Sequence, residues 1–417
     1  MKHILVLLTP VFCSTALLAQ TDDPAFLAKF ETSFESAGNV PAKDFLPAKL
    51  LTGRLHTVRP LAFNDGLRNT YYVETPSGVQ EITTTPALAE FVLELSAIDY
   101  LRGVSKTDAF NKALVNAGKA KVESAGKLIA DPFGTIKNVP AGASRFFGRV
   151  GEGLKGGASK TEDSGLAGLL GVTKAKSKLA AQLGVSPYST NQELQRELTS
   201  VAQAMAGGGL VMDLATSAVS GGAGTALTVV GVNQTLSDTL VNSTPDDLRL
   251  LNRKKLLALG VNRGLTDEFL MHPWFSPWHE TITTDALNTI GVNPTAFLTD
   301  AVQALTTEDA FYFQRVAQIL AKYHTTAGPL AAIRFDNGLI TALAKDGTLV
   351  VPVSLDYAQW GERTARRAEE FGALDKARAQ ITGLAVWTDG RLSDRLCAEL
   401  KARGIAWRMN ALDSTAR

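Results

Sequence analysis

The sequence predicts a helix-rich α+β protein with a small N-terminal α+β unit, a central α-helical bundle, and a C-terminal α/β-type domain of order βββαβαβ. Two patterns support this prediction. Helical periodicity with strong capping signals dominates the middle of the chain, and short strand-forming runs separated by turn signals lie on both sides of it. With 417 residues, of which 45% are hydrophobic, the chain can also bury two or three cores.

Changes in charge and in hydrophobic period divide the chain into five segments. No internal repeat links these segments, so each is interpreted separately. We predict a signal peptide at residues 1–19, the small α+β unit at 20–110, a basic glycine-rich connector at 111–185, the helical bundle at 186–328, and the C-terminal domain at 329–417.

The first residues have the charged, apolar and small-residue order of a secretory signal peptide. Met1-Lys2-His3 carries positive charge, an interrupted apolar run extends to Leu18, and Ala19 is a candidate cleavage residue. The run is too short to span a membrane well. We therefore expect an exported cell-envelope protein, either periplasmic or secreted, with peripheral attachment to a membrane as an alternative. Removal of Cys13 leaves only Cys397, which excludes an intramolecular disulfide bond.

Residues 50–84 are predicted to form short strands. Asp65-Gly66 and Pro76-Ser77-Gly78 are turn signals, and the strand-forming residues Tyr71, Tyr72 and Val73 lie between them. Thr85-Pro86 then provides an N-cap and a first-turn proline, which predicts a helix that ends near Gly103.

The segment 111–185 is rich in glycine, and its basic residues far outnumber its acidic ones. The simplest interpretation is a loosely structured connector with a solvated basic face. The alternative is a surface that docks on anionic lipid, although the regular apolar face of such a helix is weak here.

Residues 189–324 carry the clearest helical signals. Ser189 or Thr190 is a candidate cap for the first helix, and Thr244, Ser276 and Asn293 each precede a proline. Thr307 comes before two acidic residues and an apolar helical stripe. Several helices joined by short loops indicate a bundle.

The stretch Gly207–Leu236 is glycine-rich and apolar, and it is uncharged from Leu214 to Ser237. Its strongly apolar residues give only roughly −2 to −4 kcal/mol for membrane insertion. We therefore expect a closely packed helix or helix pair in a soluble core. The alternative is a segment that inserts after a conformational change, which would make this a membrane-perturbing protein.

From Ala331 onward the period changes to that of strands. Asn337-Gly338 and Asp346-Gly347 separate three strand-like runs, which predicts two hairpins. A charged helix near Glu362–Leu374, a strand at Ile381–Trp387 and a helix capped by Ser393 follow. Ile405-Ala406-Trp407 is a candidate last strand.

Two groups of residues are candidates for chemistry. His272, His279 and Glu280 surround an aromatic cluster and carry zinc-ligand side chains, but their spacing matches no known short metal signature. Asp356 and Asp389 each follow a predicted strand. If these strands are parallel neighbours, both carboxylates lie at the carboxyl edge of the sheet, where they are suited to cation binding or acid–base work.

Other functional signals are weak. Gly151–Gly156 has the spacing G-x-G-x-x-G but lacks the preceding strand and the following helix of a dinucleotide site, so no cofactor is expected. A formal net charge of +1 does not indicate a nucleic-acid partner.

These observations favour a non-enzymatic envelope protein that binds a partner protein or an anionic membrane surface. Two alternatives remain open. One is a hydrolase or metal-dependent enzyme that uses the His272/His279/Glu280 cluster or the Asp356/Asp389 pair. The other is the membrane-perturbing protein that acts through Gly207–Leu236.

Overall fold

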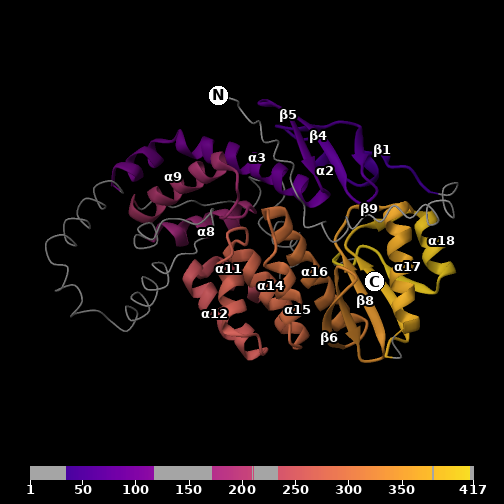
Figure 1. Ribbon diagram of the computed structural model, residues 1–417. Coiled ribbons are helices and arrows are strands. Elements are labelled where there is room, and N and C mark those ends of the chain that lie inside the picture. Colours follow the sequence, from indigo (N-terminus) through magenta and orange to yellow (C-terminus); the bar gives the residue numbers. More distant parts are fainter. Residues whose placement is uncertain (1–33, 117–170, 209, 211–232, 378–379, 414–417) are drawn as a thin grey trace, which may run out of the picture.

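The computed structural model describes residues 34–116, 171–208, 210, 233–377 and 380–413, and within them the chain is a helix-rich α+β protein, as predicted (Figure 1). The signal peptide, most of the basic segment and nearly all of Gly207–Leu236 lie outside these ranges, so their interpretations remain predictions. None of the described helices is long and apolar enough to cross a membrane.

The N-terminal unit is an antiparallel sheet packed against the first part of a long helix. Hairpins form at both predicted turns. At the first turn, the Asp65 carboxylate accepts hydrogen bonds from the amides of Leu67 and Arg68. Gly78 directly follows the second turn. The elements of the unit are β1 (Gly38–Pro41), α2 (Ala48–Leu51), β2 (Thr57–Val58), β3 (Leu61–Asn64), β4 (Asn69–Thr75), β5 (Gly78–Thr83) and α3 (Thr85–Ser105).

Helix α3 connects the sheet to a separate helical layer (Figure 1). Its first half buries Leu88 and Val92 against the sheet, and its second half buries Ile98 and Leu101 among α8 (Val172–Leu183) and α9 (Gln192–Gly208). Helix α8 lies in the stretch that we expected to be a connector. The lysines of this helix obscured an apolar face in the sequence, since Leu179 and Leu183 are fully buried.

The central bundle confirms two of the predicted caps and corrects the others, since Asn191 rather than Ser189 or Thr190 caps α9, and the helix at Thr295–Ala301 follows Pro294 rather than Asn293. Thr244 and Ser276 each form a capping box at the start of their helices, as their position before a proline predicted. Thr306, one residue before the predicted Thr307, caps the long helix that follows. The helices are α11 (Gln234–Asn242), α12 (Pro245–Ala258), α13 (Arg263–Leu270), α14 (Pro277–Ile290), α15 (Thr295–Ala301) and α16 (Thr307–Thr326).

The C-terminal domain has the predicted order of strands and helices. Its sheet runs β12-β10-β8-β7-β6, with antiparallel pairing from β6 to β8 and parallel pairing from β8 to β12. Its elements are β6 (Leu330–Asp336), β7 (Leu339–Ala344), β8 (Thr348–Val353), α17 (Glu362–Ala377), β10 (Gly383–Thr388), α18 (Asp394–Ala402) and β12 (Ile405–Arg408).

The two faces of this sheet belong to different cores. Val350 packs towards α15 and α16, whereas Leu349 and Val351 pack towards α17 and α18. This alternation is expected for a strand covered by helices on both faces. The bundle and the C-terminal domain therefore share one core through α16.

A second, two-stranded parallel pairing lies beyond the carboxyl ends of β8 and β10. It joins β9 (Tyr357–Ala358) to β11 (Arg391–Leu392). Gly390 comes so close to the backbone of the other segment that an added Cβ would overlap the carbonyl oxygens of Leu355 and Asp356. Only glycine fits this approach without a shift of the backbone.

We expect Gly390→Ala to lower the free energy of unfolding by about 1 to 3 kcal/mol, because a backbone carbonyl cannot rotate away as a flexible side chain can. Urea denaturation measures this change. Gly372→Ala in α17 is the matched control. Its added Cβ has open space, so we expect a stabilisation of about 0.5 to 1 kcal/mol. Equal stability of the two variants would contradict the close approach at Gly390.

Candidate functional site

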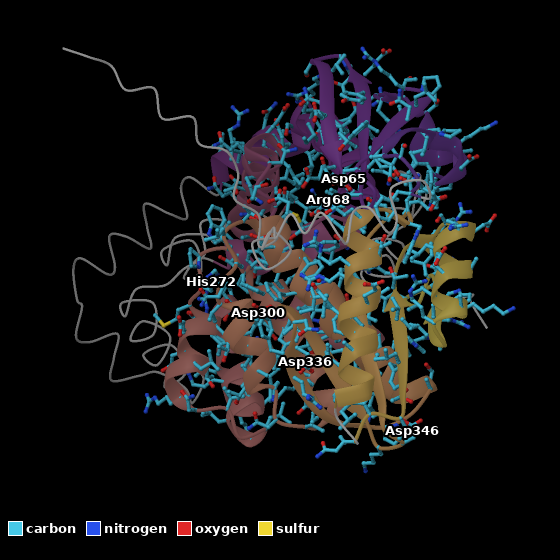
Figure 2. All side chains as sticks on the ribbon, turned by 45° about the vertical axis from the view of Figure 1, so that its right-hand side comes forward. Asp65, Arg68, His272, Asp300, Asp336 and Asp346 are labelled. Atoms are coloured by element: carbon cyan, nitrogen blue, oxygen red, sulfur yellow. The ribbon has the colours of Figure 1, made fainter. Side chains whose placement is uncertain are left out.

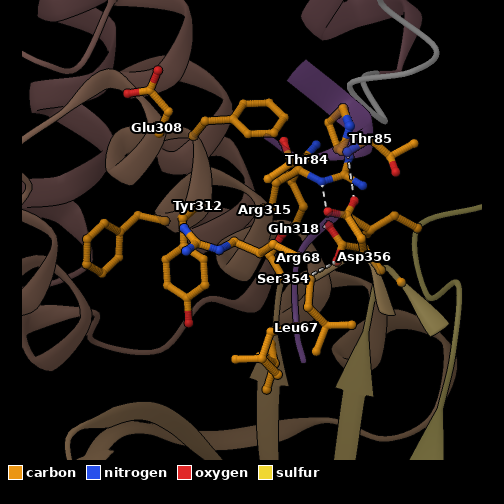
Figure 3. A pocket seen from close by; sticks show the side chains of 18 of the residues that line it. Leu67, Arg68, Thr84, Thr85, Glu308, Tyr312, Arg315, Gln318, Ser354 and Asp356 are labelled. Atoms are coloured by element: carbon orange, nitrogen blue, oxygen red, sulfur yellow. Dashed lines mark hydrogen bonds and ion pairs between the residues drawn. The ribbon is translucent and has the colours of Figure 1, made fainter. Parts of the chain in front are cut away.

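A cavity of about 1560 Å³ lies where the N-terminal unit, α16 and the carboxyl ends of β8 and β10 meet. Figure 3 shows side chains from the start of α3, from α16 and from the end of β8 that face one another. Ligand sites in open α/β sheets often lie outside the carboxyl ends of the strands. A cavity between structural units, with several polar groups on its wall, is therefore the candidate functional site.

The predicted aspartate pair lies on the wall of this cavity. Strands β8 and β10 are parallel neighbours with Val353 opposite Thr388, so Asp356 and Asp389 both follow strand ends at the same edge. The charge of Asp389 contributes to raising the pKa of Asp356, after the larger effect of desolvation. The condition stated for this pair, that its two strands are parallel neighbours, is met, and a chemical role for the pair stays a prediction.

Both carboxylates are already engaged by protein groups. Asp389 pairs with Arg315 at 2.9 Å and accepts a hydrogen bond from the Ser354 hydroxyl at 2.8 Å. Asp356 accepts hydrogen bonds from the amides of Asn69 at 2.9 Å and Thr85 at 2.8 Å. These contacts join segments that are far apart in the sequence but lie next to one another on the cavity wall. They therefore hold the parts of the wall together.

Asp65 and Arg68 lie at the boundary between the N-terminal sheet and the rest of the molecule (Figure 2). Arg68 donates to the Asp65 carboxylate at 3.1 Å. The two arginines labelled in Figure 3, Arg68 and Arg315, are thus both paired with aspartates. Their charges are balanced within the protein.

Three glutamates on the cavity wall were not recognised from the sequence. Glu90 and Glu94 lie one turn apart on α3, and Glu308 is in the first turn of α16. Glu94 is buried and bound by Ser189 and Asn191. Glu90 and Glu308 have no hydrogen-bond or ion-pair partner among the described residues. In the sequence they resemble ordinary solvated helix acids, so no signal distinguished them.

The position of Glu90 changes its acidity. Its side chain is exposed to the cavity, and the protein atoms around this side of α3 disfavour its charged form. This desolvation, together with the charges of Glu94 and Glu308, raises the pKa of Glu90 to about 7. Burial also raises the pKa of Asp300, elsewhere on the cavity wall, to about 6. Such groups in a cavity are typical of functional sites.

The structure does not bring the predicted histidine cluster together on the cavity wall. His279 lies there, but its Nδ1 accepts from the Ser276 amide at 3.4 Å as part of the capping box of α14. Glu280 is fully buried in the bundle, 3.8 Å from Arg249, and His272 packs edge-on against Phe275. Within the described part of the chain, no group of three His, Cys, Asp or Glu side chains is arranged to hold a metal ion.

Comparisons with known proteins give no further guidance. No protein-family model, curated protein or solved structure matches this chain. The geometry and charge of the cavity therefore carry the functional argument.

We predict that His279 makes the protein sensitive to acid. Burial lowers the pKa of His279 to about 4, so the folded state disfavours the protonated ring. Stability is then lost as the pH falls from about 6.5, where the unfolded ring titrates, towards 4. Glutamine retains an acceptor for the capping box but does not titrate.

Urea unfolding between pH 4 and 7.5 tests this prediction. We expect the wild type to lose about 2 kcal/mol more than His279→Gln over this range, after allowance for partial solvation. Parallel stability curves for the two proteins would show that the ring of His279 titrates normally.

Proposed function

We propose that this chain is an exported binding protein of the cell envelope, and that its ligand site is the cavity at the carboxyl ends of β8 and β10. The observation that carries the proposal is the large cavity between three parts of the fold. On its wall lie two carboxylates, Glu90 and Glu308, that have no ion-pair partner among the described residues. The predicted signal peptide supports the cellular location, and the cavity supports the binding function.

Lys49, Lys322, Arg363, Arg367 and Arg391 also line the cavity, but the part of its wall between α3 and the first turn of α16 favours a ligand that carries a cationic group. Arg68 and Arg315 are neutralised by aspartates, whereas Glu90 and Glu308 repel each other. A bound cation would relieve this repulsion. The rings of Phe311 and Tyr312 also line the cavity, and aromatic faces attract cations. A basic side chain of a partner protein and a small amine share this chemistry.

A second candidate function is acid–base hydrolysis. The specific observation in its favour is the raised pKa of Glu90, to about 7, because a carboxylic acid that titrates near neutral pH is suited to proton transfer. The Asp356/Asp389 pair is less suited to this role, since protein donors occupy both carboxylates. Docking of residues 111–185 on anionic lipid and insertion of Gly207–Leu236 remain separate proposals based on the sequence.

The cationic-ligand proposal predicts a charge-dependent change in affinity. Isothermal titration with spermidine, choline and arginine methyl ester should identify a cation that binds, while glutamate and citrate should not bind. We expect Glu90→Gln to weaken binding of that cation roughly tenfold, which corresponds to about 1.4 kcal/mol. The control is Glu81→Gln, on the exposed strand β5 away from the cavity, which should bind normally.

Binding should also depend on pH. Glu90 is neutral below its pKa of about 7 and ionised above it, so affinity for the cation should rise between pH 6 and 8. This rise should disappear in Glu90→Gln. Absence of binding by all three cations, or equal binding of the anions, would contradict the proposal.

The export prediction has its own test. Cells that produce the full chain with a C-terminal tag should release a protein whose N-terminus lies near Gln20 into the periplasm or the medium. Recovery in membranes that resist salt and carbonate washes would contradict this result and favour insertion of Gly207–Leu236. Release by high salt alone would favour docking by the basic segment.

A further inference from the structure

The backbone is strained at Thr84, directly before α3. Within the described part of the chain, the non-glycine residues with positive φ are Thr84, Asn337 and Asn410. Asparagine tolerates this conformation, but a β-branched residue is a true outlier there. Thr84 has φ 83° and ψ 142°, a conformation that the Cβ of threonine disfavours.

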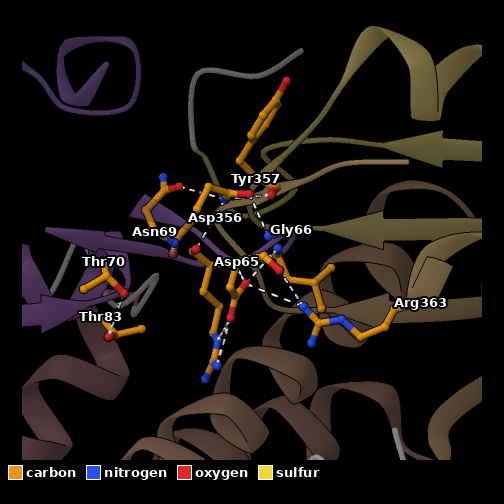
Figure 4. A network of polar contacts seen from close by, with 11 residues as sticks. Asp65, Gly66, Asn69, Thr70, Thr83, Asp356, Tyr357 and Arg363 are labelled. Carbon is orange, nitrogen blue, oxygen red and sulfur yellow. Dashed lines mark hydrogen bonds and ion pairs between the residues drawn. The ribbon is translucent and has the colours of Figure 1, made fainter. Parts of the chain in front are cut away.

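Thr84 is held in this conformation by contacts on both sides. Its amide donates to the Asn69 carbonyl at 2.8 Å, and its hydroxyl accepts from the Ala87 amide at 3.3 Å as the N-cap of α3. Asp356 reaches the same place from the C-terminal domain. Its two carboxylate oxygens accept from the amides of Asn69 and Thr85, so one side chain holds the start of β4 and the start of α3 together (Figures 3 and 4).

Further bonds tie the backbone around Asp356 to the N-terminal turn. The amide of Asp356 donates to the Leu67 carbonyl at 3.0 Å, and the amide of Tyr357 donates to the same oxygen at 3.1 Å. Arg363 donates to the Asp65 carbonyl at 2.6 Å. Figure 4 shows Asp356, Tyr357 and Arg363 gathered around the turn at Asp65 and Gly66. These hydrogen bonds fix the loop from which the Asp356 carboxylate reaches the start of α3.

The start of α3 determines where the cavity carboxylate Glu90 lies. Glu90 is on the second turn of α3 and lines the same cavity as Glu308 of α16, a helix that shares a core with the C-terminal sheet. The same loop that carries Asp356 also holds Asp389 through Leu355 and Ser354. The loop at residues 354–356 therefore links the cavity wall that carries Glu90 to the wall where Asp389 pairs with Arg315.

We propose that Asp356 is a positioning residue of the cavity, which holds Thr84 in its positive-φ conformation and so fixes the start of α3, and with it Glu90, on the cavity wall. The ligand site itself rests on the proposed function, but this geometry is testable without a ligand. A buried carboxylate that only stabilised the core would also matter for folding. A positioning role and a purely stabilising role of Asp356 predict different effects of the substitution Thr84→Gly.

Glycine adopts φ near +83° without the steric penalty of threonine, and it is nearly as good an N-cap. If Asp356 acts by holding Thr84, then Thr84→Gly should compensate for its loss. If Asp356 acts only as a buried polar group, glycine at position 84 should not help. The compensation therefore separates the two roles.

The experiment follows the carboxyl titration of Glu90 by ¹³C NMR in the full mature chain, with Glu90→Gln to assign the signal. We expect Asp356→Ala to lower the titration midpoint by about one pH unit or more, because Glu90 moves away from Glu308 and from the protein atoms that disfavour its charged form. The double variant Asp356→Ala/Thr84→Gly should recover at least half of this shift. Thr84→Gly alone should titrate like the wild type.

Thr244→Gly is the matched control, because Thr244 is also the N-cap of a helix but has an ordinary φ of −80°. It should not restore the midpoint in the Asp356→Ala background. If Asp356→Ala does not fold, Asp356→Asn retains one acceptor oxygen and should show a smaller shift in the same direction.

An unchanged Glu90 titration in the Asp356 variants would overturn the proposal. Equal recovery with Thr84→Gly and Thr244→Gly would overturn it as well. Failure of every cation to bind would instead count against the proposed function, and it would leave this result intact because no ligand is used here.

Discussion

The Asp356 carboxylate is buried where the C-terminal domain meets the N-terminal unit, and the arrangement of the cavity depends on it. It accepts the backbone amides of Asn69 and Thr85, and desolvation raises its pKa even though these donors favour the charged form. A buried carboxylate is tolerated only where donors replace the lost water. The backbone of both units must therefore keep these amides directed at one side chain, and this requirement accounts for the strained Thr84 beside them.

The cavity combines two electrostatic environments. On the strand-end side, Arg315 neutralises the charge of Asp389, which also accepts hydrogen bonds from the Ser354 hydroxyl and the Leu355 amide. On the helical side, Glu90 and Glu308 line the cavity without such partners in the described chain, and desolvation together with the charges of Glu94 and Glu308 raises the pKa of Glu90. A site whose charges are paired within the protein on one wall, and carry excess negative charge on the other, can orient a ligand that has a single charged end. This asymmetry is the reason for preferring a binding function over a purely structural cavity.

Much of the fold follows from local signals. Thr244 and Ser276 before prolines predicted helix starts correctly, and Asn337-Gly338 predicted the first C-terminal hairpin, because capping and turn preferences act over only a few residues. Local signals failed where packing decided the outcome. Helix α8 was predicted as connector because its lysines dominate the composition, although Leu179 and Leu183 bury its apolar face in the core that it shares with α9.

The sequence by itself determined the α+β class, the strand order along the chain, and the presence of Asp356 and Asp389 at strand ends, because these depend on short-range preferences and on the regular geometry of parallel strands. Only the tertiary structure decided what those aspartates contact and which acids share the cavity. The amides bound by Asp356 lie 287 and 271 residues away, and Glu90 meets the charge of Glu308 only after three parts of the fold have packed together. No local pattern encodes such contacts, since desolvation and Coulomb interactions depend on distances that folding alone creates.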